Sequence, residues 1–154
     1  MFQFNRTWGT KCPVFFKTII VDTLKPKAPN YNWTDKSILI IDDDHLNCKV
    51  IAHFLDPTLC NYSCQVNPQK AISLIKENNF DLIFTEVLFR KYMNYDILEQ
   101  IRSINKTIPI IVQTAYFFYY QRYMFFERGA NAFFTKPLPF RQLPGILNSY
   151  LYLD

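Results

Sequence analysis

Glycine is scarce in this sequence, which contains 3 glycines against 15 phenylalanines and 10 tyrosines. No two of these glycines are close enough to build a glycine-rich loop around a phosphate group, so that class of nucleotide site is excluded. The chain also lacks an apolar run near the length of about 18 residues that a membrane-spanning helix needs. The apolar segment at residues 13–16 is followed by Lys17 and has no small-residue cleavage site. We therefore expect no signal peptide and no membrane partner, and a cytoplasmic protein.

A clustered basic charge is also missing from most of the chain. Residues 1–36 contain six Lys or Arg and two Asp or Glu, whereas residues 37–154 contain eleven of each. The net charge of +4 therefore belongs to the first segment. The remainder lacks the basic excess typical of nucleic-acid-binding domains, so no nucleic-acid partner is expected.

The cysteines do not form a metal-binding pattern. Three residues separate Cys60 from Cys64, but no second pair and no nearby histidine completes a zinc site. The other two cysteines are Cys12 and Cys48. Because no secretory signal is expected, we predict that all four thiols are reduced.

Short apolar runs alternate with stretches of helical periodicity from residue 37 onward. The expected strands are residues 37–41, 62–66, 81–85, 108–112 and 132–135. The expected helices are residues 46–55, a helix opened by Asn67 and Pro68, and residues 95–104, 118–128 and 141–151. Five strands that alternate with five helices predict an α/β fold with a parallel sheet covered on both faces.

Polar side chains follow four of these strands. Ligands of such a sheet bind at the carboxyl ends of the strands. The residues at these ends are Asp42, Asp43 and Asp44, then Glu86, Thr114 and Lys136.

Three of these carboxylates would repel one another unless a cation neutralises them. Asp42, Asp43 and Glu86 supply oxygen ligands, which suit Mg²⁺, and Lys136 is the other candidate counterion. The alternative is a solvated turn in which the aspartates only cap the next helix. The matching positions of Thr114 and Lys136 favour the functional interpretation.

Four motifs, at residues 38–44, 81–87, 114–116 and 129–137, resemble those of response-regulator receiver domains of two-component signalling. The resemblance covers about residues 36–152 without a gap. It implies a flavodoxin-like fold with strand order 2-1-3-4-5, and a histidine kinase or phosphotransfer protein as partner.

The resemblance also assigns roles to single residues. It makes Asp42 and Asp43 the acidic pair that holds Mg²⁺. Thr114 corresponds to the switch hydroxyl, Phe133 to the switch aromatic residue, and Lys136 to the family's lysine. Asn47 is similar to the receivers attached to hybrid histidine kinases.

The sequence departs from the family at the phosphoacceptor, because Glu86 stands where receivers carry an aspartate. Asp81 lies at the wrong end of the third strand and Asp96 lies inside the next helix, so neither is expected to reach the acidic pair. A side chain one methylene longer is misplaced by about 1 Å, which costs about 100-fold in phosphoryl transfer. We therefore hypothesise a pseudo-receiver, not an enzyme, in which Glu86 mimics the phosphorylated acceptor. Two alternatives stay open: a phosphorylatable receiver that uses Glu86 and Mg²⁺, and a module that no longer signals.

Aromatic residues occupy eight of the eleven positions from residue 116 to residue 126. If Phe118, Arg122, Phe125 and Phe126 face the sheet, the other side chains of this helix point elsewhere. Those side chains form a candidate protein–protein or homodimer interface: Phe117, Tyr120, Tyr123 and Met124. The alternative is a set of unrelated surface tyrosines.

Residues 1–36 are expected to be a leader and linker, and residues 37–152 the receiver domain. Residues 8–20 resemble the last strand of a histidine-kinase ATPase domain, and residues 25–30 are a proline-stiffened linker. Residues 31–33 precede the first strand and are placed to dock on it.

Overall fold

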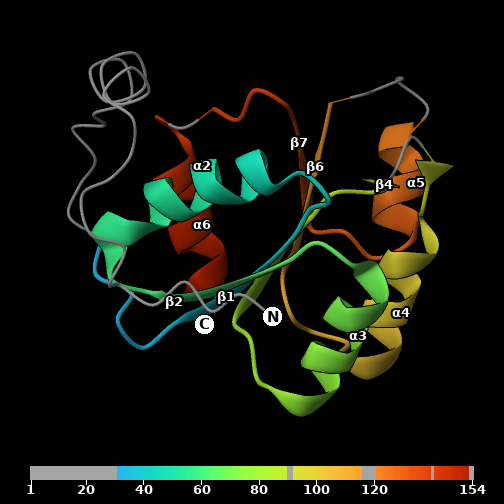
Figure 1. The fold of residues 1–154 in the computed structure, drawn as a ribbon, viewed down its shortest axis with the longest axis horizontal. Coiled ribbons are helices and arrows are strands. Elements are labelled where there is room, and N and C mark those ends of the chain that lie inside the picture. The colour runs from blue at the N-terminus through green and yellow to red at the C-terminus, as the bar shows by residue number, and fades with distance from the viewer. Residues whose placement is uncertain (1–30, 90–91, 116–120, 140, 153–154) are drawn as a thin grey trace.

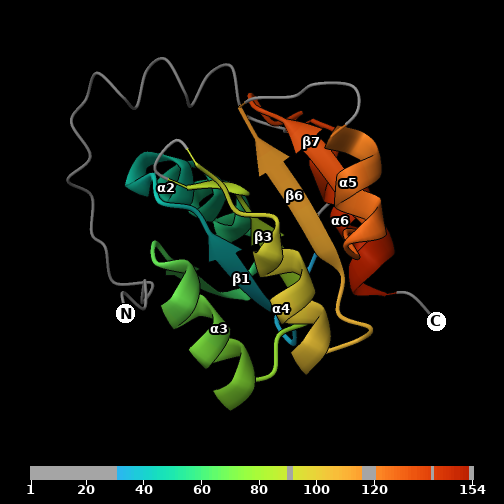
Figure 2. The same ribbon diagram turned by 90° about the vertical axis from the view of Figure 1, so that its right-hand side faces the viewer.

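The computed structural model describes residues 31–89, 92–115, 121–139 and 141–152, and the following elements lie in these ranges. Parallel strands form one sheet in the order β2-β1-β3-β6-β7 (Figures 1 and 2). The strands are β1 (Ser37–Ile41), β2 (Asn61–Gln65), β3 (Leu82–Thr85), β6 (Ile110–Thr114) and β7 (Ala132–Thr135). This is the predicted order and the flavodoxin-like α/β fold.

Helices cover both faces of the sheet (Figure 1). They are α2 (His45–Leu55), α3 (Pro68–Glu77), α4 (Asp96–Ile104), α5 (Gln121–Glu127) and α6 (Leu143–Leu151), with a short 3-10 turn, η1 (Asp56–Thr58), after α2. One apolar cluster joins the sheet to α2 and α6, and a second joins it to α3, α4 and α5.

The sheet is apolar on both sides because its strands are buried on both sides. Ile38 and Ile40 of β1 lie in the cluster under α2 and α6, whereas Leu39 and Ile41 lie in the cluster under α3 and α4. This two-sided burial explains why β1 is a continuous apolar run rather than an alternating one.

Local signals placed most element ends to within one or two residues. Asn67 caps α3, since its Oδ1 accepts from the backbone N–H of Lys70 at 3.1 Å, and Pro68 is the first helical residue. The fourth strand starts later than predicted, at Ile110, because Pro109 has no N–H to give to the ladder. The short antiparallel pair β4 (Leu88–Phe89) and β5 (Tyr92–Met93) was not predicted.

Residues just before β1 dock on the domain, as expected. Trp33 is fully buried in the cluster under α2 and α6. Its backbone N–H donates to Thr58 O at 2.7 Å, and its indole Nε1–H donates to Asn148 Oδ1 at 3.1 Å. The predictions for residues 1–30, the kinase-like strand included, lie outside the described residues.

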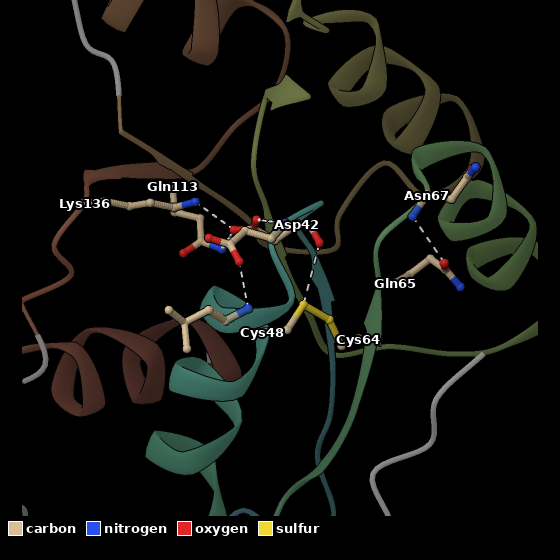
Figure 3. The surroundings of a disulfide bond; sticks show 9 residues. Asp42, Cys48, Cys64, Gln65, Asn67, Gln113 and Lys136 are labelled. Atoms are coloured by element: carbon tan, nitrogen blue, oxygen red, sulfur yellow. Dashed lines mark hydrogen bonds and ion pairs between the residues drawn. A yellow bond between two sulfur atoms is a disulfide. The ribbon is translucent and has the colours of Figure 1, made fainter. Parts of the chain in front are cut away.

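The prediction of four reduced thiols is wrong for Cys48 and Cys64, which form a disulfide (Figure 3). Cys64 pairs with Ile40 in the ladder between β2 and β1, and α2 carries Cys48 back over this ladder. The crossover thus brings the two sulfur atoms together, whereas spacing along the chain gave no sign of it. Cys60 is buried in the cluster under α2 and α6.

No helix in the described part of the chain is both long enough and apolar enough to cross a membrane.

Reduction of the Cys48–Cys64 disulfide should lower the free energy of unfolding by about 3 kcal/mol. The bond closes a loop across a separation of 16 residues, and cross-linking a loop of this size limits the unfolded chain. Urea unfolding with and without reductant measures the loss, and the effect of reductant should vanish in a Cys48→Ala, Cys64→Ala double variant. Rapid alkylation of both thiols in protein never exposed to reductant would contradict the pairing.

Replacement of Gly129 by alanine should cost about 1–3 kcal/mol of stability. Gly129 has φ +97°, and an added Cβ would lie 2.6 Å from Cγ of Arg102. Arg102 cannot easily yield, since its guanidinium donates to the carbonyl oxygens of Gly129 and Ile108. Gly145 is the matched control, because it lies exposed in α6 with only an ordinary contact at its Cβ position. Gly145→Ala should stabilise the domain by about 0.5–1 kcal/mol, so equal losses in both variants would refute this account.

Candidate functional site

The site lies at the carboxyl edge of the sheet, where the ends of β1 and β3 are joined. The backbone N–H of Glu86 donates to Ile41 O at 2.8 Å, and that of Asp42 donates to Gln65 O at 3.2 Å. These bonds extend the ladder one residue beyond the strands and set Glu86 beside Asp42.

Lys136 bridges the two carboxylates. Its Nζ donates to Asp42 Oδ2 at 2.7 Å and to Glu86 Oε2 at 2.9 Å. The main chain holds the lysine in place, because the N–H of Lys136 donates to Thr114 O at 2.8 Å, directly after β7. The sequence predicted this convergence of Asp42, Glu86 and Lys136 from their positions after three strands.

Backbone donors complete the environment of Glu86. This side chain is 3% exposed, and its Oε1 accepts from the N–H groups of Val87 at 2.8 Å and Leu88 at 3.0 Å. The chain therefore wraps around the carboxylate as it leaves β3. Both oxygens of Glu86 have protein donors.

Both oxygens of Asp42 also accept hydrogen bonds. Its Oδ1 accepts from the N–H of Asp44 at 2.9 Å, and its Oδ2 accepts from Gln113 Nε2 at 3.2 Å as well as from Lys136 (Figure 3). Burial raises the pKa of the Asp42 carboxyl above its ordinary value, although the bond from Lys136 acts in the opposite direction.

The charge of Lys136 is stabilised by its two partners. Burial acts to lower the pKa of Lys136, but the hydrogen bonds and charges of Asp42 and Glu86 outweigh it, and the pKa is raised. Lys136 is therefore a permanent cation in this pocket at neutral pH.

Gln113 is the site residue that sequence reasoning missed. It follows the apolar run Ile110–Val112 in β6 and is fully buried, so only the end of that apolar run, just before Thr114, could have drawn attention to it. Its Nε2 donates to Asp42, while its Oε1 has no hydrogen-bond partner. A buried amide with one unsatisfied end is unusual in a folded protein.

The other predicted site residues lie around this pocket. Thr114 is buried at the end of β6, and Asp43 is half-buried beside Asp42. Asp44 caps α2, since its Oδ1 accepts from the N–H of Leu46 at 2.8 Å, which is the structural alternative considered above. Phe133 contacts Phe125 of α5, with ring centroids 5.8 Å apart.

The arrangement does not fit a resident Mg²⁺ ion. The described residues contain no group of three His, Cys, Asp or Glu side chains placed to hold a metal. The carboxylate oxygens of Asp42 and Glu86 already accept from N–H groups, and the Lys136 ammonium lies between the two carboxylates.

Helix α5 exposes part of its aromatic surface. Tyr123 is 68% exposed and Phe126 41% exposed, whereas Phe125 is buried and Met124 half-buried. The assumption that Arg122, Phe125 and Phe126 all face the sheet holds only in part, because Arg122 is exposed and Phe126, although it contacts Phe133 of β7 with ring centroids 6.1 Å apart, stays exposed. The predictions for Phe117, Phe118 and Tyr120 lie outside the described residues.

Residues 38–148, most of the chain, match the family of the response regulator receiver domain. This chain belongs to that family. The receiver is 27% identical over 114 residues to the transcriptional regulatory protein ZraR of Escherichia coli, an alignment of 74% of this chain and 26% of ZraR. The chain thus spans about a quarter of the length of that relative.

Solved structures agree with this assignment. A two-component response regulator from Clostridium difficile is similar with a TM-score of 0.72 and 27% identity, covering 77% of this chain and 97% of the other. The receiver domain of a Pseudomonas aeruginosa sensor histidine kinase, with a magnesium ion coordinated in its active-site cleft, has a TM-score of 0.67 and 22% identity. That alignment covers 75% of this chain and 97% of the other, and at this identity it shows the fold alone.

Receiver domains take part in two-component signalling and interact with histidine kinases or phosphotransfer proteins. They commonly bind Mg²⁺ in the active site. The fold and the general function predicted from the sequence are thereby confirmed.

Replacement of Lys136 by methionine should lower the free energy of unfolding by about 3–5 kcal/mol at neutral pH, since two buried carboxylates lose their counterion. Because the pKa of Lys136 is raised, its contribution persists up to the ordinary lysine value of 10.5 and is lost as the pH rises beyond it. Chemical denaturation at several pH values measures the difference between the two proteins.

Lys106→Met serves as the control, because Lys106 is exposed and its loss should change stability by less than about 0.5 kcal/mol. Adding Asp42→Asn to Lys136→Met should recover part of the loss. Equal stability of the native protein and Lys136→Met would mean that the bridge contributes nothing.

Proposed function

We propose that this receiver is a pseudo-receiver, in which Glu86 supplies permanently the negative charge that a phosphorylated acceptor supplies transiently. One observation carries the proposal: the buried Glu86 carboxylate accepts a hydrogen bond from the Lys136 ammonium, with Nζ 2.9 Å from Oε2. In this proposal Glu86 stands in the acceptor position at the end of β3. The lysine that would bind a phosphoryl group is bound to a carboxylate instead.

The surroundings of Glu86 argue against phosphorylation. A nucleophilic carboxylate needs a free oxygen aligned with the phosphorus atom. Both oxygens of Glu86 are occupied by donors, and the side chain is buried. We infer that the chain does not catalyse its own phosphorylation and is not an enzyme.

Partners follow from the same proposal. A histidine kinase or phosphotransfer protein would recognise the edge of the sheet around Asp42 and α2. We propose attachment to a hybrid histidine kinase on the basis of Asn47, which lies half-buried in α2. Any Mg²⁺ binding would be weakened, because Lys136 competes for the same carboxylates.

A phosphorylatable receiver is the first alternative. Membership of the family and the gathering of Asp42, Thr114 and Lys136 at one sheet edge favour it equally. It requires that Lys136 leave Glu86 so that a carboxylate oxygen becomes free.

A protein–protein interaction module is the second alternative. The exposed rings of Tyr123 and Phe126 on α5 favour it, because aromatic side chains are enriched at the centres of interfaces. Such a module would be indifferent to the charge of Glu86.

Incubation with acetyl phosphate and Mg²⁺, followed by intact-mass measurement, tests the proposal. The native protein should gain no phosphoryl group, and Glu86→Asp should gain one, because the shorter side chain loses its backbone donors and frees an oxygen. A phosphorylated native protein would establish the first alternative. If neither protein is modified, the pocket no longer supports the chemistry at all.

Self-association measured by sedimentation distinguishes the pseudo-receiver from the second alternative, the protein–protein interaction module. Glu86→Gln should change the association state or partner affinity of a charge-mimicking receiver. A Tyr123→Ser, Phe126→Ser double variant should abolish association only for an interaction module, in which Glu86→Gln has no effect.

A further inference from the structure

Gln113 presents a donor to the pocket and leaves an acceptor unused. The side chain is fully buried in β6, where its neighbours Ile111 and Val112 are apolar and also fully buried. Its Nε2 donates to Asp42 Oδ2 at 3.2 Å, and Oε1 has no partner. Burying an amide with an unsatisfied oxygen is destabilising, so a structural role alone gives a poor account of this residue.

The donor and the lysine meet at one atom. Asp42 Oδ2 accepts from Gln113 Nε2 at 3.2 Å and from Lys136 Nζ at 2.7 Å, and Oδ1 accepts from the N–H of Asp44 (Figure 3). A divalent cation binds a carboxylate through the same oxygen lone pairs. An N–H group cannot act as a metal ligand, and it places positive charge where the cation would approach.

We propose that Gln113 is a positioning residue: it keeps the Asp42 carboxylate oriented for its hydrogen bond from Lys136 and thereby keeps Mg²⁺ out of the pocket. The lysine ammonium offsets one of the two negative charges of Asp42 and Glu86, which a metal ion would otherwise help to offset. A neutral side chain on β6, which β3 separates from β1 in the sheet, thus removes the Asp42 carboxylate from metal binding. This inference deepens the proposed function, since a pocket closed by its own lysine requires neither metal nor phosphoryl group.

Titration with Mg²⁺ by isothermal titration calorimetry, without any phosphodonor, tests this role. Gln113→Met keeps the length of the side chain and removes the donor. We expect it to bind Mg²⁺ about tenfold more tightly than the native protein, the factor that one hydrogen bond to a charged group represents. A residue needed only for structure would weaken binding when replaced.

Gln121→Met is the matched control. Gln121 is also a buried glutamine, and its Nε2 donates to Tyr95 Oη at 3.0 Å, away from the carboxylates. Its replacement should leave Mg²⁺ affinity unchanged. Unchanged or weaker Mg²⁺ binding by Gln113→Met would overturn the proposal.

A measurement on the native protein covers the case in which Gln113→Met does not fold. The side-chain amide signals of Gln113 in a nitrogen–proton NMR spectrum should stay in place as Mg²⁺ is added to millimolar concentration. A saturable shift of these signals at low Mg²⁺ would refute the exclusion. Because acetyl phosphate is absent, phosphorylation of the native protein in the earlier test and failure of metal exclusion here are separate outcomes.

Discussion

The buried contact of Lys136 with two carboxylates is the interaction on which this site depends. Asp42 and Glu86 are both buried, and unpaired charges in such surroundings are strongly destabilising. One ammonium neutralises one of the two negative charges. Backbone N–H groups of Asp44, Val87 and Leu88 stabilise the remaining negative charge.

The fold supplies this contact through the geometry of parallel strands. The carboxyl ends of β1, β3, β6 and β7 lie along one edge, and each contributes one side chain to the pocket: Asp42, Glu86, Gln113 and Lys136. Apolar clusters on both faces hold the strands in register, and the Cys48–Cys64 disulfide fixes α2 over β2. The pocket is thus a product of the whole sheet, and movement of any one strand would open it.

Two side chains determine how this pocket is closed. A glutamate after β3 reaches the lysine with one more methylene than an aspartate would have, and a glutamine in β6 adds a donor to Asp42. Together they join Asp42, Glu86 and Lys136 in one set of hydrogen bonds. The charged groups of the pocket are thus already paired with one another, as in a buried salt bridge, and not arranged to bind a ligand.

Much of the fold was determined by the sequence alone, because its signals are local. Apolar runs and helical spacing marked the strands and helices. Asn67 and Pro68 marked the start of α3, and Gly129, which has a positive φ, lies two residues beyond the end of α5. The positions of Asp42, Glu86 and Lys136 after their strands also followed from the chain, since parallel strands bring these ends together.

Only the tertiary structure decided the contacts between residues that lie far apart in the chain. The bond from Gln113 to Asp42 spans 71 residues, that from Lys136 to Asp42 spans 94, and that from Trp33 to Asn148 spans 115. The Cys48–Cys64 disulfide likewise depends on the crossover from β1 to β2. Periodicity and capping describe only a few residues at a time. The atoms that meet in this pocket are selected by strand register and side-chain reach, which exist only once the sheet has formed.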